Sequence, residues 1–84
     1  MMKKFNLFII NEMNKKVLDF TIFCIENVAE YLQLTGDEVY KILTEKSDIL
    51  DQYIIPCYDA LHTQGHVYIV NDIVDLMRER GLQA

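Results

Sequence analysis

Residues 53–66 read YIIPCYDALHTQGH and gather a cysteine, an aspartate, two histidines and two tyrosines around the only proline of the chain. If this stretch formed one continuous helix, Asp59, His62 and His66 would lie at positions i, i+3 and i+7, on one side of the helix. Carboxylate and imidazole groups in that arrangement could bind a divalent metal ion. Alternatively, Cys57 and His62 could act as a nucleophile and its general base.

Three features of the same stretch weaken both chemical hypotheses. Gly65 interrupts the helical spacing just before His66. Cys57 and His62 are separated by five positions, and residues that far apart are not neighbours on a helix. No third group that would orient the histidine is marked in the sequence. We therefore predict no catalytic residue, no metal site and no cofactor, and we interpret the protein as a non-enzyme.

The stretch is better interpreted as architecture with one exposed side. We expect Pro56 to break the helix. Cys57 and Leu61 should face the core, whereas Asp59 and His62 should pair across one turn or cap backbone groups near the break. Tyrosine and histidine add amphipathic surface of the kind enriched at protein interfaces. The candidate partner-binding residues are Tyr53, Tyr58, Asp59, His62, His66 and Tyr68.

Composition indicates a single folded domain with a conventional core. Of the 84 residues, 51% are hydrophobic and 11% aromatic, which is far from the composition of disordered chains. The net charge of −5 makes nucleic acid an unfavourable partner, because phosphate groups repel an acidic surface. Cys24 and Cys57 have no CxxC spacing, so we interpret both as reduced thiols.

The beginning of the chain, MMKKFNLFII, resembles the charged and apolar parts of a signal peptide. The apolar run is too short, however, and NEMNKK follows where a small-residue cleavage site would be needed. No uncharged apolar stretch is long enough to span a membrane. We therefore expect a cytoplasmic protein that does not bind membranes. Because Met13 opens a second start-like run, we predict an N-terminal extension over residues 1–12 and a helical domain over residues 13–84.

The hydrophobic periodicity is helical along the whole domain. A first helix is predicted from Asn14 to Leu34, and its broad apolar stripe would meet several neighbours. Thr35 and Glu38 form a capping-box pattern that begins a second helix, which should run to about Lys46. The stripe of the first helix comprises Val17, Leu18, Thr21, Ile25, Val28 and Leu32, widened by Phe20, Cys24 and Tyr31.

The second half of the chain should contain two more helices. Ser47 and Asp48 can cap a third helix, which Pro56 kinks or breaks by displacing Ile55 from the α region, and which then continues to Gly65. The segment HVYIV has the β-branched content of a strand, but the apolar spacing that follows it favours a helix ending at Gly81. The predicted fold is all-α, a small single-domain bundle of about four helices.

The runs MNKKVLDFTIFCIENVAEYL and YIIPCYDALHTQGHVYIVNDIVDLMRERG carry a resemblance to a known family. They resemble a family of short bacterial proteins of unknown function in which a YI-PCYD-LHTQG segment is followed by an apolar helix. The resemblance covers about residues 13 to 82. It implies an all-helical domain without an established activity, whose genes often stand beside ADP-ribosyltransferase-like proteins of toxin type. That association suggests an accessory or antitoxin-like role.

Two functional hypotheses remain open, and the first is that the protein is a DNA-binding regulator with a helix-turn-helix. In IENVAEYLQLTGDEVYKIL, the small Ala29 followed by a turn and a second apolar pattern matches the spacing of that motif. Against it, Asp37 and Glu38 would begin the recognition helix, and Gln33 stands where a turn glycine is usual.

The second hypothesis, which we favour, is that the protein is a protein-interaction module without catalytic activity. It accounts for the acidic surface and for the many aromatic and aliphatic residues of a short chain. The partner would be another protein or a second copy of the chain, and nucleic acid is not expected.

We predict that divalent metal ions neither bind to the protein nor stabilise its fold, because Gly65 interrupts the helical spacing of Asp59, His62 and His66. A ligand that binds the native state must raise its stability by mass action. Thermal melts with zinc, with nickel and with a chelator should therefore coincide. A zinc-dependent rise in the melting temperature that disappears in His62→Ala would contradict this prediction.

Overall fold

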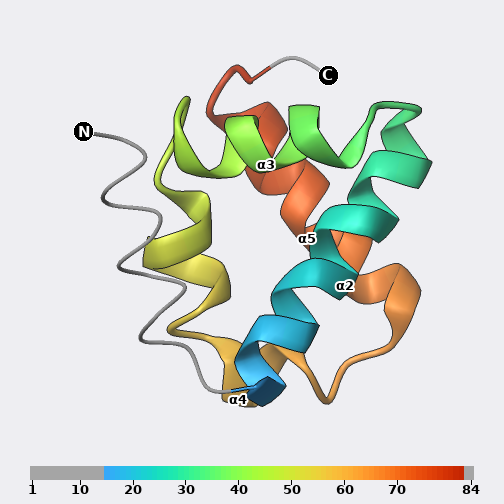
Figure 1. Ribbon diagram of the computed structural model, residues 1–84, viewed down its shortest axis with the longest axis vertical. Helices are drawn as coiled ribbons and strands as arrows, with labels where there is room; N and C mark the ends of the chain where they lie inside the picture. Colours follow the sequence, from blue (N-terminus) through green and yellow to red (C-terminus); the bar gives the residue numbers. More distant parts are fainter. Residues whose placement is uncertain (1–14, 83–84) are drawn as a thin grey trace.

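The computed structural model describes residues 15–82, which form an all-α domain with no strand in that range. In chain order its elements are α2 (Lys15–Leu32), α3 (Gly36–Thr44), the π-helical turn η1 (Leu50–Ile54), α4 (Tyr58–Leu61) and α5 (His66–Glu79). Helix α2 packs on both α3 and α5, and α3 lies across the upper part of the molecule (Figure 1). The predicted all-α class is confirmed, whereas the predicted extension over residues 1–12 lies outside the described residues.

One hydrophobic core joins the helices. In α5 the buried side chains follow the predicted apolar spacing, so the strand-like segment HVYIV is helical as expected. In α3 the buried apolar side chains are Val39, Ile42 and Leu43. The fully enclosed large side chains are Leu43, Ile49, Ile54, Ile73 and Met77.

The buried face of α2 is narrower than predicted. Only Thr21, Cys24, Val28 and Ala29 are buried on this helix, and the Thr21 hydroxyl donates a hydrogen bond to the Val17 carbonyl at 2.9 Å. Burial raises the pKa of the Cys24 thiol from 9.0 to about 12. The remaining residues of the predicted stripe are half-buried or exposed, because α3 and α5 are the two helices that cover α2 most extensively within residues 15–82.

Helix α2 ends in a Schellman motif, with Gln33 in the left-handed conformation at φ 59°. The Gln33 N–H donates to the Glu30 carbonyl at 3.3 Å, and the Leu34 N–H donates to the Ala29 carbonyl at 2.9 Å. Helix α5 ends in the same way at Gly81, as predicted, with φ 73°. Gln33 therefore occupies a backbone position that glycine adopts with less strain.

The predicted capping box at the start of α3 is confirmed. The Thr35 hydroxyl accepts a hydrogen bond from the Glu38 N–H at 3.0 Å, and the Thr35 N–H donates to the Glu38 carboxylate at 2.9 Å. Two of the backbone donors that a helix start leaves without partners are thereby satisfied. Together with the turn at Gln33, this box fixes the connection between α2 and α3.

The predicted break near Pro56 occurs, but the conformation expected for Ile55 is wrong. Ile55 keeps helical angles, φ −68° and ψ −49°, and its N–H donates to the Leu50 carbonyl at 2.9 Å, five residues back. This wider π turn accommodates the proline ring, which would otherwise collide with the carbonyl four residues before it. The departure from helical geometry comes instead at Cys57, with φ −96° and ψ 14°.

The expected continuation of the third helix to Gly65 is also wrong. Helix α4 ends at Leu61, and residues 62–64 form a turn. Gly65, with φ −71° and ψ 158°, is the N-cap residue of α5 and does not end the preceding helix. Leu61 is buried as predicted, whereas Cys57 is only half-buried.

Substituting Gln33→Gly should stabilise the domain by about 0.5–1 kcal/mol. Replacing an L-residue in the left-handed region by glycine relieves roughly 1–2 kcal/mol of strain in the folded state. Glycine also gives the unfolded chain more conformational freedom, which lowers stability by about 0.4–1 kcal/mol and offsets part of that gain. Urea denaturation measures the difference. Gln64→Gly is the matched control, because Gln64 is exposed and has no positive φ, and it should be neutral or destabilising. An equal effect of both substitutions would contradict the strain argument.

Candidate functional site

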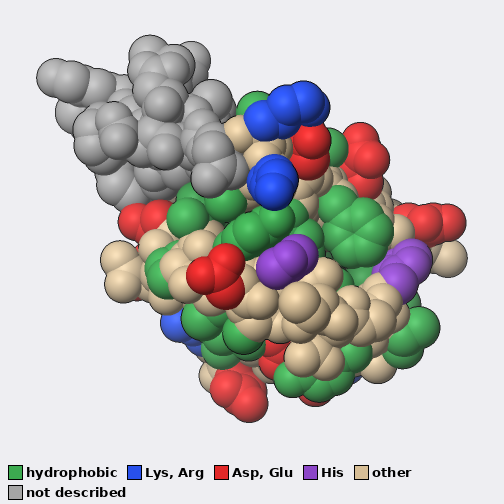
Figure 2. All heavy atoms as spheres, turned by 90° about the horizontal axis from the view of Figure 1, so that it is seen from below, with side chains coloured by type: hydrophobic (Ala, Val, Ile, Leu, Met, Phe, Trp, Pro, Cys, Tyr) green, Lys and Arg blue, Asp and Glu red, His purple; other side chains and the backbone are tan. Residues whose placement is uncertain are grey.

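Three of the predicted partner-binding residues belong to an aromatic row that holds the α4–α5 connection against α2. The His62 ring stacks on Tyr58 at 4.2 Å between centroids, and Tyr58 meets the edge of Phe20 at 5.4 Å. Phe20 lies 6.2 Å from Phe23, and Phe23 contacts His66 edge-on at 5.6 Å. We call Phe20, Phe23, Tyr58, His62 and His66 the aromatic row. Figure 2 shows two histidine side chains on the face seen from below, with hydrophobic side chains between them.

The hydrogen bonds of this region are local. The Nδ1 atom of His62 lies 2.7 Å from the Tyr58 carbonyl oxygen, so the histidine caps a backbone group near the break. Asp59 is exposed, and within residues 15–82 it forms no ion pair with His62. The sequence predicted either a pair between Asp59 and His62 or capping of nearby backbone groups, and the structure shows capping by His62.

Tyr53 and Tyr68 have different environments, although the sequence suggested the same role for both. Tyr53 is half-buried, and its hydroxyl donates a hydrogen bond to the Asp72 carboxylate, which ties η1 to α5. This bond, with burial as a smaller contribution, raises the pKa of Tyr53. Tyr68 is 54% exposed. Tyr53 is thus engaged within the domain, while Tyr68 faces solvent.

The residues that suggested chemistry are not brought together as a metal site. Throughout the described part of the chain, no group of three or more histidine, cysteine, aspartate or glutamate residues is placed to hold a metal ion. Cys24 and Cys57 are both free thiols. The predictions on metals and on catalysis remain predictions that solution experiments must test.

A groove lies between α2 and α5. Helix α2 contributes Asn27, Glu30 and Tyr31, helix α5 contributes His66, Val67, Val70 and Asn71, and the groove has a volume of about 370 Å³. Val67 is 70% exposed and Tyr31 is 54% exposed. We call these seven residues the α2–α5 groove.

Of the predicted site residues, only His66 lines this groove. Sequence reasoning assigned Tyr31 to the apolar stripe of the first helix and did not single out Val67. A signal for Val67 was present, because the residues four and eight positions after it, Asn71 and Asp75, are both polar. An apolar residue on the same helix face as polar residues is expected to be exposed to solvent and available to a partner.

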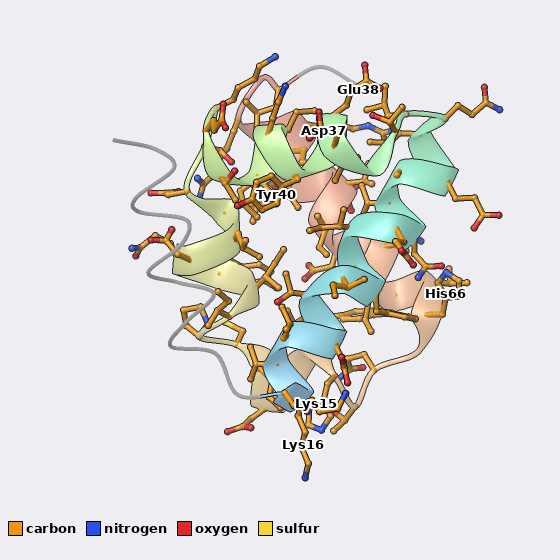
Figure 3. All side chains as sticks on the ribbon, in the orientation of Figure 1. Lys15, Lys16, Asp37, Glu38, Tyr40 and His66 are labelled. Atoms are coloured by element: carbon orange, nitrogen blue, oxygen red, sulfur yellow. The ribbon has the colours of Figure 1, made fainter. Side chains whose placement is uncertain are left out.

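The α2–α3 hairpin, on which the DNA-binding alternative rests, carries acidic side chains at the start of α3. Asp37 and Glu38 are exposed at the start of α3, as Figure 3 shows. The Lys41 ammonium is 3.4 Å from the Asp37 carboxylate, so this cation is partly neutralised within the helix. Figure 3 also places Lys15 and Lys16 at the opposite end of α2. This surface gives little support to the DNA-binding alternative.

Comparison with known proteins identifies a family but no activity. The family model described as "Protein of unknown function (DUF3791)" matches residues 19–80. No curated protein and no solved structure matches the chain. Across residues 15–82, no helix is both long enough and apolar enough to cross a membrane.

Substituting Tyr53→Phe should destabilise the domain by about 1–2 kcal/mol, because it leaves the half-buried Asp72 carboxylate without its donor. Since the folded state raises the pKa of Tyr53 above its ordinary value of 10.0, the contribution is complete below pH 10 and declines as the pH rises further. Urea denaturation at pH 7 and above pH 10 measures both effects. Tyr68→Phe, at the exposed tyrosine, should change stability by less than about 0.5 kcal/mol. Equal losses of stability in the two variants would show that the hydrogen bond from Tyr53 to Asp72 contributes no more than an exposed tyrosine hydroxyl does.

Proposed function

We propose that this chain, which belongs to the DUF3791 family of proteins of unknown function, is a protein-interaction module that acts without catalysing a reaction. The observation that carries the proposal is the α2–α5 groove, with exposed apolar side chains on both walls. Within residues 15–82, the large hydrophobic side chains with the greatest exposure are Val67, Tyr31, Tyr68 and Ile22. Two of these four, Val67 and Tyr31, face the same groove from different helices.

Single exposed apolar residues are normal on protein surfaces, so their grouping is the informative feature. A concave site lined by apolar side chains, with a few polar groups at its edge, is the usual form of a docking site. Asn27, Glu30 and Asn71 supply those polar groups here. The groove therefore supports recognition of another protein, and His66 is the predicted partner-binding residue that lines it.

The partner that we favour is a protein of toxin type, for which this chain would serve as an accessory or antitoxin-like protein. The support is the resemblance noted from the sequence, since genes of similar proteins often stand beside ADP-ribosyltransferase-like proteins. This support is an association between genes, and it adds no contact or mechanism.

Capture from an extract of the native cell, with the full chain as bait, tests the proposed function. A protein retained by the original chain should be lost when the bait carries Val67→Asp, because a carboxylate would then have to be buried in the apolar groove. Ala60→Asp is the matched control, as Ala60 is exposed on α4, outside the groove, and the substitution adds the same charge. Identical sets of captured proteins for the two variants would mean that the groove is not the interface.

A further inference from the structure

We propose that the occupant of the α2–α5 groove is an amphipathic helix of a protein partner, with lysine or arginine residues flanking its apolar face. This inference rests on the proposed function and adds the chemistry of the partner. The apolar side chains of that helix would fill the groove between Tyr31 and Val67. Its cations would meet the acidic side chains on the exposed face of α2.

The charge around the groove is strongly one-sided. Residues 17–40 contain no lysine or arginine, and their acidic residues are Asp19, Glu26, Glu30, Asp37 and Glu38. Residues 66–77, which form most of α5, also contain no lysine or arginine, but carry Asp72 and Asp75. A partner with basic flanks would meet no opposing cation in either segment.

Two of these carboxylates are placed beside the groove and form no ion pair with any described residue. Glu30 lines the groove, and Glu26 lies one turn before it on α2, so the two share one helix face. Both are exposed. Within residues 15–82 the ion pairs are Lys15–Asp19, Lys41–Asp37 and Arg80–Asp48, and none involves Glu26 or Glu30. The groove thus has an acidic wall available to a partner.

The walls of the groove favour a helical occupant over an extended one. An added strand needs a sheet edge whose backbone N–H and C=O groups are free, whereas both walls here are helices that bond their own backbone groups. The Asn27 amide also donates one of its two hydrogens to the Phe23 carbonyl at 2.7 Å, which leaves only one donor on this side chain for an extended chain. A helix satisfies its own backbone and can present side chains at the spacing of a groove between two helices.

A second copy of the chain is a poor occupant. A two-fold contact brings the same surface of each copy together, so Glu30 and Glu26 of one copy would face an acidic surface of the other. Each copy has a net charge of −5, and the groove-forming segments offer no cation to compensate. Like charges across an interface oppose association.

A displayed library of single helices provides the test. The helices carry leucine on one face and a random choice of lysine, arginine, glutamate or glutamine at the flanking positions. The library is selected on the full chain and counter-selected on the Val67→Asp variant. Survivors should be enriched several-fold in lysine and arginine over glutamate. Val67 is the second residue of α5 and 70% exposed, where a carboxylate suits the helix dipole, so this variant should fold, and a circular dichroism melt checks it. Tyr31→Ala, at the opposite wall, should weaken the survivors as well.

A matched pair of variants then tests the acidic wall directly. Glu30→Gln should weaken the binding of a surviving peptide about two- to fivefold, the range expected for one exposed ion pair. Glu45→Gln makes the same change in charge at an exposed site on the C-terminal side of α3, outside the groove, and should leave the affinity unchanged. Fluorescence anisotropy at two salt concentrations measures both. Equal effects of the two variants would overturn the proposal.

The remaining outcomes separate this inference from the function on which it rests. If the surviving helices require Val67 but show no preference for lysine or arginine, the proposal that the partner has basic flanks is wrong. The proposal that the groove binds a protein is then unaffected. If no helix survives, the helical occupant is wrong, and capture from the cell extract still tests docking independently. Sedimentation that finds a dimer of the original chain and a monomer of Val67→Asp would assign the groove to a second copy and overturn the proposal.

Discussion

The packing of one long helix against two others is the constraint on which the rest of the domain depends. Helix α2 packs on α3 and on α5, and Cys24 and Val28 are completely enclosed on this helix. Among the described residues, α3 and α5 are the helices that cover α2 most extensively, and they leave part of its surface exposed. The α2–α5 groove lies where that exposed surface meets the beginning of α5.

The polar residues that first suggested chemistry mostly stabilise the short elements. A helix of four residues such as α4 is too short to persist by itself, and the aromatic row fastens it to α2 through Tyr58 and Phe20. The π turn η1 is tied to α5 by the hydrogen bond from Tyr53 to Asp72. Side chains engaged in this way hold the core together on one side and leave the groove as the more accessible surface.

Local features of the fold could be predicted from the sequence, and long-range features could not. The Thr35–Glu38 capping box and the left-handed Gly81 depend on residues within one or two turns, and both are confirmed. The break at Pro56 was predicted for the same reason, but the π turn that keeps Ile55 helical depends on how the whole segment packs. The environment of Tyr53 could not be predicted because its partner, Asp72, is 19 residues away. The groove depends on the crossing of α2 and α5, which no local pattern specifies.

The acidic charge and the apolar groove have complementary effects on the choice of partner. Apolar surface alone binds with little discrimination, and on a small domain it would also favour self-association. Carboxylates beside that surface oppose contact between copies and attract a partner with the opposite charge, which increases the rate of encounter more than the affinity. The affinity must then come from burying side chains such as Tyr31 and Val67, because exposed ion pairs contribute only about 0–1 kcal/mol each. For the partner that we propose, charge would therefore govern selection and apolar contact would supply the affinity.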